Sequence, residues 1–230
     1  MRPSKLTSVA RAGLLGFGLS ACSDTQGDQG SGGGGAGGNG ADWPCKNADR
    51  FASRVVEVSF GDGQKFGQDQ FPDNILGGPR GRGPNQGSLD VVSLGDGGSI
   101  VLGFSGAVIV NGPGPDLLVF ENPFFIGGDE ANPLAELGRV AVSDDGETWF
   151  EFPCSASSYP YGSCAGWHPV LANVDDADAE PFDPAKAGGD PFDLADVGLE
   201  QARFVRIVDV EGDDAAFDLD AIAIVHAACR

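Results

Sequence analysis

Short apolar runs separated by turn residues recur along the chain from Arg54 to the C-terminus. Some alternate apolar and polar positions and others are continuously apolar, and both patterns are typical of β-strands. Gly, Asp or Pro occupies nearly every gap between them. The pattern predicts an all-β, antiparallel sandwich rather than alternating strands and helices. We expect strands at residues 55–60, 89–94, 100–104, 117–120, 140–142, 149–152, 204–208 and 217–225.

Two of these gaps have the composition of hairpin turns. They are Gly95-Asp96-Gly97-Gly98 and Asp144-Asp145-Gly146. Gly and Asp tolerate the positive φ that a tight reversal of the chain requires. We therefore expect each turn to join two strands that pair with each other.

The first 21 residues have the layout of a secretory signal peptide. Three basic residues and no acid precede the apolar run 12–19. The following Leu19-Ser20-Ala21-Cys22 resembles the bacterial lipobox, whose cysteine becomes the diacylated N-terminus. We expect cleavage after residue 21 and lipidation of Cys22. An ordinary signal peptide that ends before a cysteine is the alternative.

Residues 22–41 are mostly Gly, Ser, Asp and Gln, which predicts a flexible tether. The folded domain is then expected over residues 42–230. The anchor is followed by Ser23 rather than Asp, which by the sorting habit of enteric lipoproteins favours the outer membrane. We expect a protein of the bacterial cell envelope that faces outward and meets the membrane only through its lipid.

The charge balance narrows the choice of partners. The chain has 14 Lys and Arg against 34 Asp and Glu, with a formal net charge of -20. Such a field repels phosphates and anionic headgroups, so nucleic acid is excluded as the main partner. No apolar run reaches the roughly 18 residues that a membrane-spanning helix needs.

Four cysteines follow the lipobox: Cys45, Cys154, Cys164 and Cys229. An even number in an exported chain predicts two disulfides, for which three connectivities are possible. We favour Cys154 with Cys164, which closes a short loop, and Cys45 with Cys229, which joins the start of the domain to its end. A metal site is the alternative, but no Cys-x-x-Cys spacing is present.

The segment Val140-Ala-Val-Ser-Asp-Asp-Gly-Glu-Thr-Trp149 resembles the Val-x-Val-Ser-x-Asp-Gly-x-x-Trp hairpin of discoidin-like, galactose-binding-like jelly rolls. Residues 202–207 and 217–222 resemble later strands of that fold. The order of further motifs is similar to that in uncharacterised bacterial cell-surface proteins, at residues 116–122, 135–137, 165–169, 191–194 and 217–220. The resemblance covers roughly residues 51–225. It implies a jelly-roll β-sandwich and brings no established activity.

Acidic residues in an exported β-sandwich make calcium the first cofactor to consider, because it binds six to eight oxygen ligands. In one strand from 217 to 225, Asp218 and Asp220 would share a face with Ile222 and Ile224. Two carboxylates on an apolar face are costly unless compensated, and a bound cation would compensate them. The resemblance implies the same, since related carbohydrate-binding sandwiches often hold a structural calcium with an aspartate of the last strand.

Further ligand candidates come from the same motifs. Glu121 and Asn122 follow an apolar strand and offer oxygen ligands at its end, and Asp193 lies in the Pro-Phe-Asp-Leu stretch. The alternative is that all these acids only cap turns and solvate loops.

A possible ligand-binding loop lies near the Cys154 and Cys164 pair. Trp167 offers a flat apolar face for a sugar ring and His168 a hydrogen bond or a proton, and Tyr159 and Tyr161 are candidates to line the same cleft. The alternative is a loop that simply packs beside a disulfide. His226 is interpreted as a strand-end residue.

No sequence motif of a nucleophile elbow, a zinc protease or a phosphate-binding loop is present. We therefore expect a non-catalytic binding module, stabilised by calcium, with a glycan as the first ligand class and a surface protein as another. The alternatives are a hydrolase of surface polysaccharide or peptide, which needs converging acids or His168 with an acid, and a purely structural envelope protein.

Overall fold

The computed structural model describes residues 45–210 and 215–229. These residues belong to the compact unit Ala41–Arg230. The expected signal peptide (1–21), the lipidation site Cys22 and the tether (22–41) lie outside the described residues.

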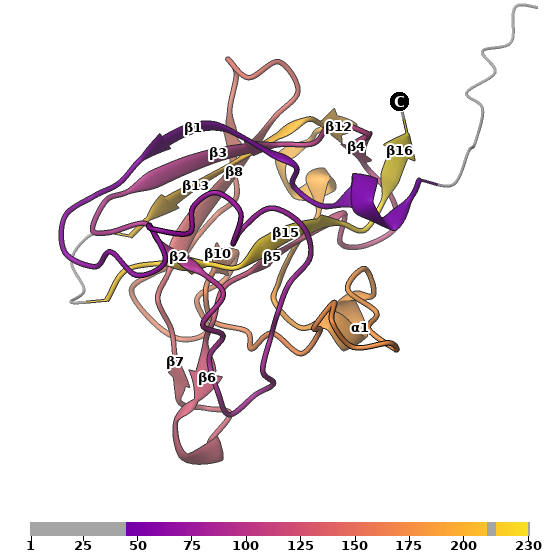
Figure 1. Cartoon of the computed structure of the whole chain (residues 1–230). Helices are drawn as coiled ribbons and strands as arrows, with labels where there is room; N and C mark the ends of the chain where they lie inside the picture. The colour runs from indigo at the N-terminus through magenta and orange to yellow at the C-terminus, as the bar shows by residue number, and fades with distance from the viewer. Residues whose placement is uncertain (1–44, 211–214, 230) are drawn as a thin grey trace, which may run out of the picture. The chain divides into compact units, whose positions relative to one another are not determined.

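The largest sheet has six antiparallel strands in the order β1-β3-β13-β8-β10, with β9 also paired to β8 (Figure 1). Alternate residues of these strands are buried, as in β13, where Val205 and Ile207 are fully buried. The strands are β1 (Arg54–Ser59), β3 (Ser99–Gly103), β8 (Gly138–Ser143), β9 (Phe150–Glu151), β10 (Cys164–Ala165) and β13 (Phe204–Asp209).

Smaller antiparallel sheets complete the fold. One has the order β11-β5-β15, a second has the order β12-β4-β16, and β14 with β2 and β6 with β7 form pairs. Their strands are β2 (Val92–Ser93), β4 (Ala107–Val110), β5 (Leu117–Phe120), β6 (Phe124–Phe125), β7 (Pro133–Leu134), β11 (Asp190–Phe192), β12 (Gln201–Ala202), β14 (Asp218–Leu219), β15 (Ala221–Ile224) and β16 (Ala227–Cys229).

Helical structure is limited to short elements. They are α1 (Pro184–Ala187) and the 3-10 helices η1 (Asn47–Arg50), η2 (Ile126–Gly128) and η3 (Leu194–Val197). Within the described part of the chain, none of these is long and apolar enough to cross a membrane.

The main core lies between the six-stranded sheet and the sheet of β5 and β15. It combines alternate apolar residues from both layers, which include Ile100, Leu102, Val140, Val142, Val205 and Ile207 on one side and Leu117, Val119, Ile222 and Ile224 on the other. Period-two alternation places these side chains on the facing sides of the two sheets. The all-β, antiparallel sandwich expected from the sequence is therefore confirmed, while jelly-roll connectivity stays a prediction.

A second, smaller core covers the outer face of β5 and β15. Leu118 and Phe120 of β5 pack there with Phe51, Val170 and Ala187, on the side where α1 lies (Figure 1). β5 is thus buried on both faces, which explains why its sequence Leu-Leu-Val-Phe is continuously apolar.

The expected strand from 217 to 225 is interrupted. It divides into β14 and β15 around Asp220, so that Leu219 and Ile222 both reach the main core. The prediction that Asp218 and Asp220 share a face with Ile222 and Ile224 is wrong, because two residues rather than one separate Leu219 from Ile222 and the alternation shifts there.

One of the two expected hairpin turns joins paired strands. The turn at residues 144–146 connects β8 with β9, which pair, and Gly146 has φ 81°. The turn at residues 95–98 connects β2 with β3, which belong to different sheets. The expectation that this second turn joins two paired strands is therefore wrong.

Both expected disulfides are present, Cys45 with Cys229 and Cys154 with Cys164. The first links residues 184 positions apart and the second closes a loop of 10 positions. The preferred connectivity of the three possible ones is confirmed.

Candidate functional site

Three of the five predicted metal ligands meet at the end of β5. Glu121 and Asn122 directly follow β5, which pairs antiparallel with β15, so that Phe120 lies opposite Ala221. The residues that precede β15 therefore lie beside those that follow β5. This pairing brings Asp218 to Glu121 across 97 residues of sequence.

Glu121 is the most deeply buried acid of this group, with 0% of its surface exposed. Its Oε1 accepts a hydrogen bond from the backbone N–H of Asp218 at 3.1 Å. Its Oε2 is also buried but has no hydrogen-bond partner. A buried carboxylate oxygen without a partner is costly, so this atom marks a place where a further positive or donor group would be stabilising.

Two further acids extend this group: the charge of Glu136 acts on Glu121, and that of Asp209 acts on Glu136. Asp209 is the last residue of β13 and lies opposite Gly138, two positions after Glu136. Oδ1 of Asp209 accepts a hydrogen bond from the backbone N–H of Phe217 at 2.9 Å. We call Glu121, Glu136, Asp209 and Asp218 the carboxylate cluster. The sequence reasoning missed Asp209 and Glu136, although Glu136 lies inside one of the motifs that carried the resemblance.

The carboxylate cluster is electrostatically unfavourable as it stands. Burial, followed by the charges of Glu136 and Asp218, raises the pKa of Glu121 well above its ordinary value. Burial, with Asp218 and Asp209, raises the pKa of Glu136 to about 7. Burial also raises the pKa values of Asp209 and Asp218. A cation among these groups would lower all four pKa values.

Asn122 ties the carboxylate cluster to the neighbouring segment. Its Nδ2 donates to the backbone oxygen of Ser88 at 3.1 Å and to Oδ2 of Asp218 at 3.4 Å. Asn122 thus stands beside the cluster, as the sequence predicted. Across the described residues, however, no group of three or more His, Cys, Asp or Glu side chains forms a ready-made metal site.

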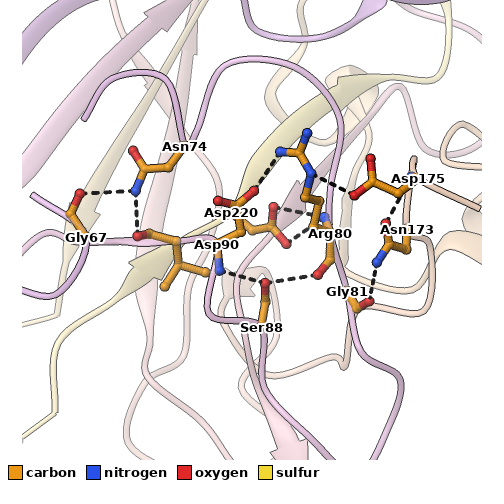
Figure 2. A network of polar contacts seen from close by, with 10 residues as sticks. Gly67, Asn74, Arg80, Gly81, Ser88, Asp90, Asn173, Asp175 and Asp220 are labelled. Atoms are coloured by element: carbon orange, nitrogen blue, oxygen red, sulfur yellow. Dashed lines mark hydrogen bonds and ion pairs between the residues drawn. The ribbon is translucent and has the colours of Figure 1, made fainter. Parts of the chain in front are cut away.

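Asp220 belongs to a different network, shown in Figure 2. The backbone N–H of Arg80 donates to both of its carboxylate oxygens, each at 3.1 Å. The Arg80 guanidinium bonds to Asp90 at 2.6 Å and to Asp175 at 3.2 Å. Ser88 accepts from the Asp90 N–H and donates to the Arg80 carbonyl.

Burial dominates the titration of Asp220. It raises the pKa of Asp220 to about 8, with the Arg80 amide opposing this effect and the charge of Asp90 adding to it. Asp220 is therefore mostly protonated at neutral pH and has hydrogen-bond partners from the protein itself. The compensation that the sequence reasoning assigned to a cation is provided here by the Arg80 amide and by protonation.

Asp193 lies apart from the carboxylate cluster. β11 pairs antiparallel with β5 so that Phe192 faces Leu117, at the start of β5, whereas Glu121 follows its end. Four residues of strand, about 13 Å, separate the two ends. Asp193 caps η3 by accepting a hydrogen bond from the Ala195 N–H at 2.9 Å. Asp193 thus agrees with the alternative interpretation, in which these acids only cap turns and solvate loops.

The predicted ligand-binding residues also gather. We call Tyr159, Tyr161, Trp167 and His168 the aromatic patch. The rings of Tyr159, Tyr161 and Trp167 contact one another, with the centroids of Tyr159 and Tyr161 5.7 and 6.0 Å from that of Trp167. The His168 ring lies 3.6 Å from Trp167. Tyr159 is 48% exposed, and Nε1 of Trp167 donates to the Cys164 carbonyl at 2.9 Å. The patch is thus built on the Cys154–Cys164 disulfide and still presents aromatic surface.

Both histidines pair with a buried aspartate. Nδ1 of His168 lies 2.7 Å from Oδ1 of Asp190, which is 2% exposed. Nδ1 of His226 lies 2.8 Å from Oδ1 of Asp116, which is fully buried. The second pair sits at the strand end that the sequence predicted for His226. Since both pairs have the same geometry, the contact by itself is a means of holding an imidazole and does not define a catalytic site.

Comparison with known proteins adds no identity: no protein-family model matches this chain, and no curated protein matches it significantly.

Proposed function

We propose that this protein is a lipid-anchored envelope protein whose β-sandwich is a non-catalytic, calcium-stabilised binding module for glycans. The observation that carries the calcium part is the buried, unpartnered Oε2 of Glu121 within the carboxylate cluster. Calcium is the preferred ion because its coordination is flexible and uses carboxylate, amide and water oxygens. The side chains have to draw together around the ion, since no ready-made site exists among the described residues.

The anchor and the ligand class rest on other features. Cys22 in the lipobox-like sequence supports lipidation and a place at the outer membrane, facing outward. The aromatic patch supports a glycan, because exposed Tyr and Trp rings pack against the apolar faces of sugars while their polar edges accept and donate hydrogen bonds. The Asp190 contact holds the His168 ring in one orientation beside the patch.

The calcium site is tested by thermal unfolding of the mature chain carrying Cys22→Ala, in millimolar calcium and in chelator. A ligand at about 100 times its dissociation constant stabilises by roughly 2.7 kcal/mol. In a domain of this size that is a shift of about 5–10 °C. We expect this shift in the parent protein and its loss in Glu121→Gln.

Asp193→Asn is the matched control. It removes an acid that the sequence predicted as a metal ligand but that lies outside the carboxylate cluster. The shift should be kept in this variant, since Asn also caps helices. An unchanged midpoint in the parent protein, or a shift that survives Glu121→Gln, contradicts the calcium site at Glu121.

A hydrolase is the second candidate, and the His168–Asp190 contact is the observation in its favour, because an orienting acid behind an imidazole is the arrangement of a general base. Within the described residues, His168 has no hydrogen bond to a serine, threonine or cysteine that would act as nucleophile. Release of reducing ends from surface polysaccharide by the parent protein, absent in His168→Ala, would favour this candidate over the binding module. The third candidate, a purely structural envelope protein, is favoured if neither a glycan nor calcium binds.

A further inference from the structure

The outer face of the six-stranded sheet carries a groove of about 320 Å³, which we call the sheet groove. On β13, Val205 and Ile207 point into the core, so Phe204, Arg206 and Val208 lie on the opposite, outward face. Strands β1 and β3 complete the floor. This volume is at the lower end of the range for small-molecule sites. Its lining includes Glu57, Ser99, Val101, Trp149, Phe204 and Arg206.

One wall of the sheet groove is the turn between β8 and β9. Oδ1 of Asp145 accepts hydrogen bonds from the N–H groups of Glu147 and Thr148, each at 2.8 Å. Ser143 Oγ accepts from the Gly146 N–H at 2.9 Å. The Thr148 and Glu147 amides, with the Ser143 hydroxyl, lower the pKa of Asp145 to about 2. The turn is thereby fixed just before Trp149.

Arg206 packs against Trp149 in the lining of the sheet groove. The guanidinium carbon of Arg206 lies 4.6 Å from the centroid of the Trp149 ring, a cation–π contact. A second guanidinium on this face, that of Arg54, lies 5.4 Å from the Phe204 ring. The lining of the sheet groove thus combines one cationic group, Arg206, with the rings of Trp149 and Phe204.

Arg206 has no acidic partner among the described residues, although the chain is rich in acids. Its Nε is buried and has no hydrogen-bond partner. Acids outnumber basic residues 34 to 14 in this chain, yet Arg206 forms no ion pair with any of the described residues. The buried Nε without an acceptor is unfavourable, and an anionic ligand bound to the partly exposed guanidinium would compensate its charge.

We infer that the sheet groove binds an acidic saccharide, with a uronic acid carboxylate on Arg206 and the sugar ring against Trp149. The charge complementarity of Arg206 and the flat aromatic wall favour a carboxylated ring over a neutral one. Ser99 and Glu57 are available to the sugar hydroxyls. The ligand class rests on the glycan function proposed above, but the site is independent of the aromatic patch and of calcium.

The test is a calorimetric titration of the unlipidated mature chain with trigalacturonate and with neutral galactotriose. We expect trigalacturonate to bind and galactotriose to bind at least about tenfold more weakly. In Arg206→Gln the affinity for trigalacturonate should fall at least about tenfold, because a charged hydrogen-bond donor is lost. Arg206→Lys should lie between the two, since an ammonium keeps the charge but not the planar fork.

Arg139→Gln is the matched control. Arg139 is an exposed arginine of β8 on the same outward face but outside the sheet groove, so its removal changes the charge equally without touching the site. Near-ultraviolet circular dichroism checks that each variant is folded. If Arg206→Gln is unfolded, the affinity of Arg206→Lys for trigalacturonate tests the inference instead.

Three results overturn the inference: no binding of trigalacturonate, equal binding of both sugars, or equal loss in Arg139→Gln and Arg206→Gln. Trp167→Ala separates this site from the aromatic patch. Binding of galactotriose that disappears in Trp167→Ala, without binding of trigalacturonate, would uphold the proposed glycan function while rejecting the sheet groove.

Discussion

Asp220 and Glu121 are two deeply buried acids on neighbouring chain segments, 2% and 0% exposed. Both oxygens of Asp220 accept the Arg80 amide, and the Arg80 side chain binds two nearby acids. Glu121 has one partnered oxygen, one unpartnered oxygen and further acids around it. Equal burial therefore comes with different partners: the protein satisfies both oxygens of Asp220, whereas Oε2 of Glu121 has no partner among the described residues.

The difference comes from what each segment faces. The segment that contains Arg80, Ser88 and Asp90 lies over Asp220 and provides a backbone donor and a guanidinium (Figure 2). Besides Glu121 itself, the carboxylate cluster holds Asp218 at the start of β14, Asp209 at the end of β13 and Glu136 before β8, and none of these acids forms an ion pair with Lys or Arg among the described residues. Burial raises the pKa of both acids, but Glu121 also lies beside Glu136 and Asp218, and a group of carboxylates is suited to bind a cation.

We expect the largest change in unfolding free energy from Asp220→Ala. It leaves the Arg80 N–H without an acceptor in a buried position, which costs about 2–4 kcal/mol of unfolding free energy. Asp220→Asn keeps an acceptor oxygen and imitates the protonated acid, so its loss at pH 6 should stay within about 1 kcal/mol. Urea unfolding in chelator measures both. Equal losses in the two variants would mean that Asp220 acts through its charge and not as an acceptor.

A smaller effect is expected from pH. An acid whose pKa is higher in the folded than in the unfolded state contributes stability that is present below its unfolded pKa of about 4 and is lost as pH rises through the folded value. The folded values are about 7 for Glu136 and about 8 for Asp220. In chelator, the unfolding free energy should therefore fall between pH 5 and 9, by at most about 1.4 kcal/mol per pH unit for each titrating group.

Calcium should distinguish the carboxylate cluster from Asp220 in the same pH series. Because a cation replaces protons in the carboxylate cluster, calcium should remove the part of the pH dependence that comes from Glu121 and Glu136. The part that comes from Asp220 should remain in calcium and disappear in Asp220→Asn. A pH dependence that calcium leaves unchanged would contradict the assignment of the cluster as a cation site.

The sequence located Glu121, Asp218 and Asp220 but neither the other two acids of the carboxylate cluster nor the partners of Asp220. The apolar run of β5 and the acids after it predicted Glu121 and Asn122 at a strand end, and the last motif predicted Asp218. The partner of Asp220 is a backbone amide 140 residues away, for which side-chain types give no signal. The interruption between β14 and β15 likewise depends on pairing with different neighbours, β2 and β5.

Tertiary pairing also explains the remaining differences. Asp193 was grouped with the ligands by its motif, but antiparallel pairing of β11 places it at the opposite end of β5. Arg206 and Trp149 were both visible in the sequence, and only the packing of the β8–β9 turn against β13 makes them neighbours. Local patterns therefore located the longest strands and one of the two hairpins, whereas a site depends on which strand ends meet.

The smallest effect is expected from Arg80→Gln. The guanidinium bonds to Asp90 and Asp175 are partly exposed, with the Arg80 side chain 41% and Asp175 69% exposed, and such pairs contribute about 0–1 kcal/mol. The backbone N–H that holds Asp220 is unchanged by this substitution, so stability should fall by less than about 1 kcal/mol and less at high salt. Urea unfolding at low and high ionic strength measures this. A loss as large as that of Asp220→Ala would show that the guanidinium, rather than the amide, compensates Asp220, and the contrast with Glu121 would then rest on charge alone.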